Sequence, residues 1–190
     1  MYQMHEKAHQ RKSQSGDMKI TIGGLPGSGT TTSARLIERN LGFKHIYAGL
    51  IFRELAEERG MSLEEFSKHA EGNRDIDNLI DRKQKELSGK YEKCIVEGRM
   101  AAYFVNADLK IWLTAPFDAR AERIANRERK SLEESKKEIK MRERSEKKRY
   151  KKFYGIDIDD LSVYDLIINT DKWEPAGVYK IIKKAIEVKR

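Results

Sequence analysis

The sequence predicts an α/β fold in which helices cover both faces of a parallel sheet. Short apolar, strand-like runs alternate with helical patterns along the chain, an order typical of folds built from strand–helix–strand units. The first unit is the clearest, because the apolar run 18–22 leads into a glycine-rich turn that opens a helix. The chain has 190 residues, 38% of them hydrophobic, which suffices for one domain with a single core.

Four more apolar runs, at 44–47, 93–97, 109–114 and 165–170, are the remaining predicted strands. Short runs of this kind, bounded by glycine, proline or polar residues, are typical of buried strands. The carboxyl ends of parallel strands meet at one edge of the sheet, where ligands bind. Residues that directly follow these strands are therefore the first candidates for a functional site.

Helical patterns fall between the predicted strands. Helices are predicted over 34–41, 51–59 and 73–87, and the capping-box pattern 62–65 begins one more. The helix over 73–87 is expected to break at Ser88 and Gly89. Because the region between these helices is poor in apolar residues, it is interpreted as a small helical insertion rather than core.

The segment 126–152 is predicted to be helical but to have little to bury. An apolar face marks a helix over 117–125 before it, and Pro175 suits the first turn of a final helix after it. Within 126–152 the apolar stripe nearly vanishes and a second capping box stands at 131–134. A pair of helices of this kind is predicted to bridge solvent and to be free to move.

Charge is concentrated in the same part of the chain. Residues 118–152 hold 15 Lys/Arg and eight Asp/Glu, so +7 of the net charge of +8 falls there. A basic patch favours polyanions such as nucleic acid, nucleotide phosphates or an acidic membrane surface. The single cysteine, Cys94, cannot form an internal disulfide, and no apolar run is long enough for a membrane span or signal peptide. A cytoplasmic location without a membrane partner is therefore expected.

The glycine-rich turn matches a phosphate-binding loop. Residues 24–31 fit the spacing G-x-x-x-x-G-K-[ST], in which backbone N–H groups surround an anion at a helix N-terminus. Thr30 occupies the lysine position, while Thr31 supplies the hydroxyl that usually contacts Mg²⁺. Because Thr30 cannot neutralise phosphate charge, phosphate transfer here would require cations from elsewhere in the chain. The alternative is a glycine-rich turn that binds no ligand.

Two other strand ends carry residues suited to a phosphate site. Arg53 lies about one turn into the helix after the second strand, and Glu97 and Arg99 follow the third. A carboxylate at that place can hold Mg²⁺ directly or through water, and an arginine can bind a phosphate bidentately. The alternatives are a solvated helix face for Arg53 and a local ion pair for Glu97 and Arg99.

The basic segment supplies the cations that the loop lacks. Arg142, Glu146 and Arg149 stand at i, i+4 and i+7, so they share one helical face, and Arg127 stands at the entrance of the segment. Arginines on a mobile element can replace the missing lysine charge. The alternative is an ordinary surface helix with salt bridges.

The ordered series of motifs resembles the nucleoside-monophosphate kinases of the P-loop fold, most closely the archaeal type of cytidylate kinase. The resemblance covers residues 18–190 and rests on 24–31, 48–53, 60–66, 76–84, 96–99, 107–113, 142–150 and 154–160. It implies a P-loop NTPase three-layer fold with a five-stranded parallel sheet. It further implies a monophosphate-binding insertion at about 53–88 and a mobile lid at about 127–152. Residues 1–17 are polar and aperiodic and are interpreted as a disordered leader or an expression remnant.

The resemblance implies ATP as co-substrate with Mg²⁺. The residues that would bind ATP are Gly24, Leu25, Pro26, Gly27, Ser28, Gly29, Thr30, Thr31 and Thr32, with Lys172 and Trp173 near the base. Thr31 and Glu97 would hold the metal. The lid residues Arg142, Arg149 and Arg127 would act on the transferring phosphoryl group, with Glu146 orienting them. In bacterial relatives an aspartate stands where this chain has Glu146.

The acceptor implied by the resemblance is CMP, and dCMP as well, which would be phosphorylated to CDP and dCDP by in-line transfer. Arg53, Gly98 and Arg99 would meet the acceptor phosphate. Candidates for reading the cytosine are Asp77, Asp81, Arg82 and Gln84. Met100 stands where the bacterial type has an aspartate, so those contacts cannot be carried over.

Two kinds of alternative function remain open from the sequence. One is another small-acceptor kinase of the same fold, acting on adenylate, uridylate or dephospho-coenzyme A. The other is a non-catalytic RNA-binding protein with a degenerate phosphate loop, which the basic segment and the missing lysine would support. The sequence contains no RNA-binding motif with interleaved aromatic residues. A monomer that binds small-molecule nucleotides, with no stable nucleic-acid partner, is therefore expected.

Overall fold

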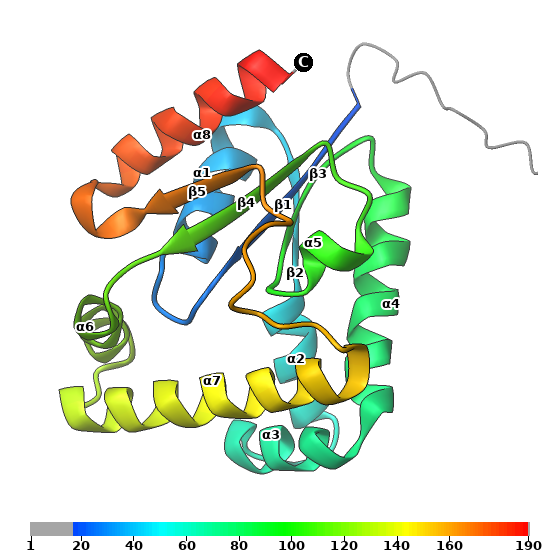
Figure 1. Ribbon diagram of the computed structural model, residues 1–190, viewed down its shortest axis with the longest axis vertical. Helices are drawn as coiled ribbons and strands as arrows, with labels where there is room; N and C mark the ends of the chain where they lie inside the picture. The colour runs from blue at the N-terminus through cyan, green and yellow to red at the C-terminus, as the bar shows by residue number, and fades with distance from the viewer. Residues whose placement is uncertain (1–16, 190) are drawn as a thin grey trace, which may run out of the picture.

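The computed structural model describes residues 17–189 and contains a five-stranded, all-parallel sheet in the order β2-β3-β1-β4-β5 (Figure 1). The strands are β1 (Met18–Gly24), β2 (Lys44–Tyr47), β3 (Lys93–Glu97), β4 (Leu109–Thr114) and β5 (Leu166–Asn169). The predicted fold class is confirmed. The leader predicted at 1–17 lies, except for Asp17, outside the described residues.

β1 is the central strand. It pairs with β3 on one side and β4 on the other, with Ile20 opposite both Ile95 and Leu109. Both pairings are parallel, so the carboxyl ends of these three strands share one edge of the sheet. The glycine-rich loop after β1 and the residues after β3 are thereby brought together, as the sequence predicted.

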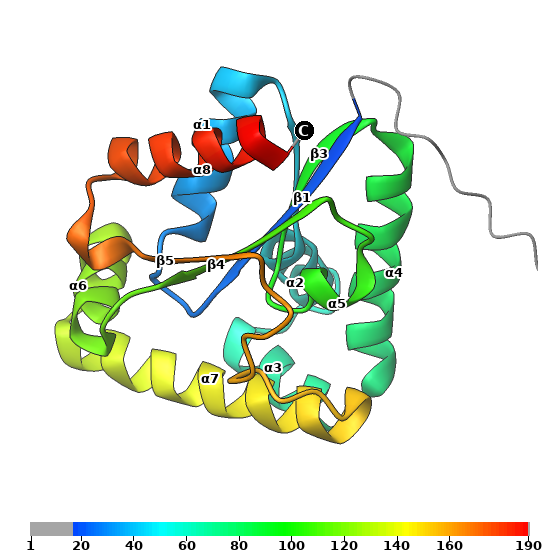
Figure 2. The ribbon, with the colours of Figure 1, turned by 45° about the horizontal axis from the view of Figure 1, so that its top comes forward.

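One face of the sheet is covered by α1 (Thr30–Leu41) and α8 (Pro175–Lys189), which lie side by side (Figures 1 and 2). Ile37 of α1 and Ile182 of α8 are fully buried there against alternate residues of β1, Ile20 and Ile22. Alternation along a strand sends its next residues to the other face, where β2 and β3 contribute the buried Ile46, Cys94 and Val96. Burial of these side chains drives the layers together.

The opposite face packs against α4 (Arg74–Lys90) and α5 (Ala101–Phe104). The helix break expected at Ser88 and Gly89 is wrong, since α4 continues to Lys90. The buried Ser88 donates its hydroxyl to the carbonyl of Lys85 at 2.9 Å. A glycine costs a helix only about 1 kcal/mol, and packing against β3 outweighs that cost. The short helix α5 was not predicted.

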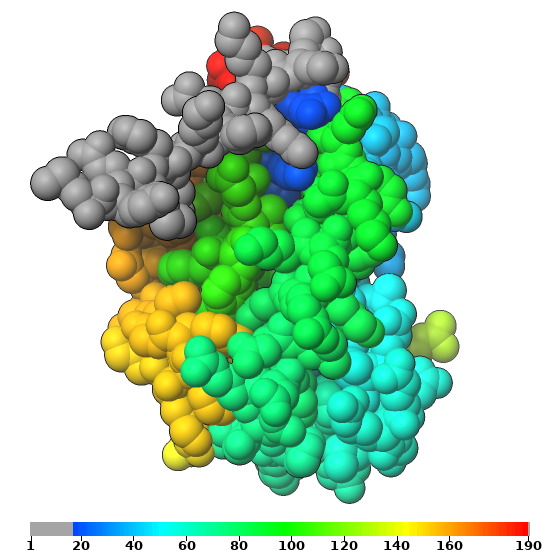
Figure 3. Space-filling view, turned by 90° about the vertical axis from the view of Figure 1, so that its right-hand side faces the viewer, coloured from blue at the N-terminus to red at the C-terminus, as the bar shows by residue number. Residues whose placement is uncertain are grey.

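α2 (Ala48–Glu57), α3 (Leu63–Gly72) and α4 form a second apolar cluster around the buried Phe66. In Figure 3 these helices form much of the lower part of the face turned to the viewer. Ser62 begins α3 with the predicted capping box, because its side chain accepts from the backbone N–H of Glu65 and the Glu65 carboxylate accepts from the N–H of Ser62. The helical insertion expected in this region has its own small core.

The next two helices are α6 (Phe117–Glu128) and α7 (Leu132–Tyr154). The solvent-bridging helix pair expected over 126–152 is therefore wrong. α6 ends at Glu128, and one long helix follows the capping box at Ser131. α7 runs from α6 to α3 across the carboxyl edge of the sheet (Figure 1). Its buried positions are mostly polar, namely Ser135, Ile139, Ser145, Glu146 and Arg149. A count of apolar residues along the sequence could not predict this buried polar face.

Between residues 17 and 189, every helix is too short or too polar to cross a bilayer.

Candidate functional site

A cavity of about 760 Å³ lies at the carboxyl end of β1. Eight of the nine loop residues predicted to bind ATP line it: Gly24, Leu25, Pro26, Gly27, Gly29, Thr30, Thr31 and Thr32. The ninth loop residue, Ser28, is fully buried and does not line the cavity. The loop therefore borders the cavity, as a phosphate-binding loop requires.

Backbone geometry explains the glycines of the loop. Gly27 and Gly29 have φ of +82° and +94°, in the left-handed region that favours glycine. A Cβ on Gly27 would lie 2.5 Å from the carbonyl oxygen of Arg120. Gly29 is the N-cap of α1 and no side chain caps that helix. The first amides of α1 thus remain available to an anion in the cavity.

Side chains from α6 and from the turn after β5 donate hydrogen bonds to carbonyl groups of the loop. The sequence did not predict these contacts. Arg120 donates to the carbonyl oxygen of Pro26 at 3.0 Å. Arg123 donates to the hydroxyl of Thr170 at 2.9 Å, and that hydroxyl donates to the carbonyl of Ser28 at 2.9 Å. These residues stand more than 90 positions from the loop in sequence, so only folding could reveal the contact.

The carboxylate of Glu97 is the polar centre of the cavity floor. It is 3% exposed, and its Oε1 accepts from the hydroxyls of Thr30 and Thr31 at 2.8 and 2.6 Å. Its Oε2 lies 2.9 Å from Nε2 of His45, a residue of the neighbouring β2. The residue at the lysine position therefore binds the carboxylate. His45 was not among the predicted site residues.

A second cavity of about 140 Å³ lies between α2, α4 and α7. Asp77, Asp81 and Gln84 of α4 line it, so three of the four predicted base-reading residues come together. Arg82 does not, which corrects its predicted place in the site. Its side chain is 68% exposed and pairs with Glu86 one turn further along α4, because residue 82 faces away from the helix face that carries the other three.

The two cavities meet at three arginines. Arg53, Arg99 and Arg142, together with Gly49, line both of them. Arg53 is exposed, and its guanidinium lies 5.7 Å from the centre of the Tyr47 ring. The structure therefore places positive charge at the boundary between a large cavity beside the loop and a small cavity beside α4.

Glu146 holds two of these arginines. Its carboxylate is in ionic contact with Arg99, and its Oε1 accepts from Nε of Arg142 at 3.0 Å. Burial, with the like charge of Arg142, lowers the pKa of Arg99 to about 9. Arg99 therefore stays protonated at neutral pH.

Arg149 takes a different place from Arg142. It lines only the second cavity, where its Nε donates to Oδ2 of Asp77 at 3.1 Å in a buried ion pair. Burial raises the pKa of Asp77, while the charge and hydrogen bond of Arg149 lower it. Of the predicted pair of lid arginines, Arg142 thus lines both cavities and Arg149 only the second.

Asp81 is the most perturbed carboxyl group in the second cavity. Burial raises its pKa to about 6, the hydrogen bond from Tyr154 opposes this rise, and the charge of Asp77 adds to it. The Tyr154 hydroxyl donates to Oδ2 of Asp81 at 2.6 Å. Gln84 donates to the carbonyl of Glu97 at 3.3 Å, which ties α4 to the end of β3.

The remaining predicted residues border the first cavity. Gly98 lines it behind Glu97, and Lys172 and Trp173 line it from the loop after β5. The indole of Trp173 is 52% exposed there. The structure thus places both residues beside the cavity of the glycine-rich loop, although they lie far from that loop along the chain.

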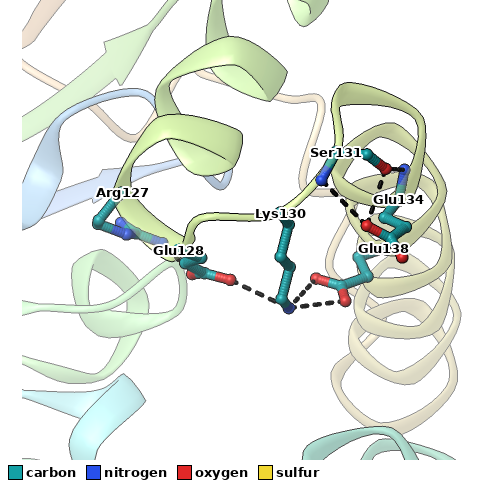
Figure 4. A network of polar contacts seen from close by, with 6 residues as sticks. All are labelled: Arg127, Glu128, Lys130, Ser131, Glu134 and Glu138. Atoms are coloured by element: carbon teal, nitrogen blue, oxygen red, sulfur yellow. Dashed lines mark hydrogen bonds and ion pairs between the residues drawn. The ribbon is translucent and has the colours of Figure 1, made fainter.

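Arg127 lines the first cavity from the last turn of α6. Figure 4 shows the polar network at this corner. Arg127 pairs with Glu128 at 2.6 Å, and Lys130 joins Glu128 at 3.2 Å to Glu138 at 2.7 Å. The network links the end of α6, which carries Arg127, to the start of α7.

Solved structures share the fold. A shikimate kinase from Bacteroides thetaiotaomicron matches with a TM-score of 0.57 at 17% identity, covering 90% of this chain and 98% of that chain. An uncharacterized protein from Eubacterium ventriosum matches with a TM-score of 0.65, also at 17% identity, with coverage of 90% and 98%. At 17% identity these matches show a shared fold, the one to which this shikimate kinase belongs.

The match to a protein family is more specific than the match in fold. Residues 19–172 match the cytidylate kinase-like family, and the chain belongs to that family. It is 56% identical over 173 residues to the cytidylate kinase of Pyrococcus abyssi, covering 90% of this chain and 95% of that protein. It is 53% identical over 174 residues to the cytidylate kinase of Archaeoglobus fulgidus, covering 91% and 97%. It is also 50% identical over 175 residues to that of Methanocaldococcus jannaschii, covering 90% and 98%.

Proposed function

We propose that this protein transfers the terminal phosphoryl group of ATP to CMP, and to dCMP as well. The observation that carries the proposal is the meeting of two cavities at Arg53, Arg99 and Arg142. Transfer between two phosphates needs donor and acceptor side by side, with positive charge where they meet. The name of the relatives, cytidylate kinase, supports CMP as the acceptor.

The larger cavity is the ATP site of this proposal. The loop amides and the uncapped start of α1 bind the phosphates, since both present N–H groups to the cavity. Lys172 and Trp173 stand at the cavity's border, where the exposed indole offers a flat surface to the adenine ring. Thr30 acts through its hydrogen bond to Glu97 rather than by charge.

The donor set fits Mg²⁺. This ion is usually bound by one or two protein oxygens together with substrate phosphates and water. Thr31 and Glu97 offer a hydroxyl and a carboxylate 2.6 Å apart beside the loop, and we assign the ion to them. Residues 17–189 contain no cluster of three or more His, Cys, Asp or Glu side chains that would compete for it. When bound, Mg²⁺ neutralises phosphate charge.

The smaller cavity is the acceptor site. Arg53 and Arg99 bind the CMP phosphate at the boundary with the first cavity, beside Gly98. The base lies among Asp77, Asp81 and Gln84, and the restricted volume of about 140 Å³ favours a pyrimidine. Carboxylates accept hydrogen bonds from the cytosine amino group, which uracil lacks.

Arg142 stabilises the charge of the transferring group, with Glu146 fixing its guanidinium and Arg127 entering from α6. No general base is needed, because the acceptor is already a phosphate oxygen. Residues 53–88 form the monophosphate-binding region and residues 127–152 the lid. Closure of the lid excludes water from ATP. Contacts between α7 and the acceptor region, such as that of Arg149 with Asp77, support the assignment of α7 as the lid.

The function is tested by ADP release at fixed ATP and Mg²⁺ with CMP, dCMP, UMP, AMP and dephospho-coenzyme A. Turnover with CMP and dCMP is expected to exceed that with the others. Preference for AMP or UMP would overturn the acceptor assignment. No ADP with any acceptor, together with RNA affinity that falls steeply with salt, would favour the RNA-binding alternative.

Replacing Arg53 with alanine is expected to raise the KM for CMP about tenfold or more, ~1.4 kcal/mol of binding, and to leave the KM for ATP nearly unchanged. The reason is that Arg53 stands at the boundary of the two cavities, where we assign it to the acceptor phosphate. Arg53→Lys keeps the charge but loses the bidentate fork, so it should fall between alanine and wild type. Initial rates at varied CMP and ATP measure both constants. Equal effects on both would contradict the assignment.

Replacing Asp81 with asparagine is expected to stabilise the protein at pH 7.5. The folded pKa of about 6 lies above the ordinary value of 3.8, so the stability that this group contributes falls as pH rises from about 4 to about 6. The amide that Asp81→Asn introduces still accepts from Tyr154 but carries no buried charge. The expected gain is on the order of 1–3 kcal/mol at pH 7.5 and nearly zero at pH 4. Thermal unfolding at both values measures it.

The same substitution should weaken base discrimination, because an amide both donates and accepts. The ratio of kcat/KM for CMP to that for UMP is expected to fall about tenfold. An unchanged ratio would remove Asp81 from base reading, whatever its effect on stability.

A further inference from the structure

We infer that His45 is a positioning residue that holds the carboxylate of Glu97 in the orientation needed for Mg²⁺. This inference rests on the proposed function, since it concerns the metal of the same site. It adds a residue from β2, a strand to which neither the sequence motifs nor the assigned ligands gave a role.

The contact comes from the pairing of two adjacent strands. β2 and β3 are parallel, with His45 opposite Ile95 and Tyr47 opposite Glu97. The His45 side chain is only 10% exposed, and its Nε2 lies 2.9 Å from Oε2 of Glu97. A carboxylate oxygen accepts, so Nε2 carries the hydrogen of this bond.

The other surroundings of His45 fix its ring. The imidazole stacks on Tyr47, with 5.9 Å between ring centres and 18° between planes. Glu38 of α1 accepts from the backbone N–H of His45 at 3.3 Å, and its second oxygen lies 4.0 Å from Nδ1. Among residues 17–189, the titratable side chains in contact with the ring are therefore Glu38, Glu97 and Tyr47. They leave Nε2 aimed at Glu97.

In this arrangement the two oxygens of the Glu97 carboxylate have different partners. Oε2 is taken by His45, while Oε1 faces the hydroxyls of Thr30 and Thr31 beside the loop. Without the ring, the carboxylate could turn and share its oxygens differently. Mutation of a residue that orients a metal ligand typically lowers metal affinity by about 10- to 100-fold. With no lysine in the loop, the site should depend strongly on that affinity.

The experiment measures ATP binding by calorimetry at a series of Mg²⁺ concentrations, without any acceptor. His45→Gln places an amide NH₂ near the position of Nε2, whereas the shorter His45→Asn places it near Nδ1. His45→Asn is expected to raise the Mg²⁺ concentration for half-maximal binding about tenfold, and His45→Gln by less than about threefold. His69→Ala, on the exposed surface of α3, is the matched control.

The outcomes separate the inference from the proposed function. If both His45 variants match His69→Ala in Mg²⁺ dependence, the inference is overturned even when CMP kinase activity is present. If His45→Asn and His45→Gln differ as expected while the wild type phosphorylates no CMP, the inference holds and the acceptor assignment fails. A purely structural role would lower the unfolding temperature in both variants without separating their Mg²⁺ dependence, and would also overturn the inference.

Discussion

Replacing Glu97 with glutamine is expected to lower kcat about 100-fold, ~2.7 kcal/mol of transition-state stabilisation. Glutamine keeps an acceptor for the hydroxyls of Thr30 and Thr31, so the local packing should survive. It removes the carboxylate charge that we assign to Mg²⁺, and a bound metal ion contributes several kcal/mol of charge stabilisation in phosphoryl transfer. The loss should be largest at low Mg²⁺ and should shrink as Mg²⁺ rises.

Steady-state rates at several Mg²⁺ concentrations measure this effect. Glu92→Gln is the matched control, because Glu92 is exposed just before the same strand. Its kcat should equal that of the wild type. Thermal unfolding establishes that the Glu97 variant is folded. A folded Glu97→Gln enzyme with wild-type kcat would exclude Glu97 from metal binding.

Replacing Arg142 with alanine is expected to lower kcat by more than tenfold, a loss exceeding ~1.4 kcal/mol. Arg142 lines both cavities and is held by Glu146 at 3.0 Å. Since Thr30 provides no charge at the lysine position, we assign positive charge on the transferring group to Arg142 of α7. The KM for CMP should change less than kcat, because the charge of that group develops during transfer.

Arg144→Ala is the matched control for Arg142. Arg144 is exposed two residues further along α7 and pairs with no carboxylate of residues 17–189 within 4.0 Å. Single-turnover rates with saturating ATP and CMP report the chemical step for both variants. An unchanged rate in Arg142→Ala would remove the lid role from that residue.

Local patterns predicted the secondary structure well. The capping boxes at Ser62 and Ser131 begin α3 and α7 as expected, because a cap depends on residues three positions apart. The strands β2, β3 and β4 match their predicted ranges, since short apolar runs between polar ends have few alternatives in a covered sheet.

The errors lie where distant packing outweighed local preference. α4 continues through Ser88 and Gly89 because its last turn packs against the sheet. α7 is anchored by the buried polar residues Glu146 and Arg149, which a count of apolar residues interprets as solvated. Arg82 shares a motif with Asp81 but lies on the outer side of the same helix.

The sequence by itself determined the phosphate-binding loop, because its residues are consecutive and their glycines are set by backbone conformation. It also predicted that arginines elsewhere would have to supply the missing charge. Only the tertiary structure decided which arginines reach the boundary of the two cavities, and that His45, Arg120 and Thr170 support the site. Those contacts join residues far apart in the chain, and their geometry depends on strand order and helix packing, which no local pattern encodes.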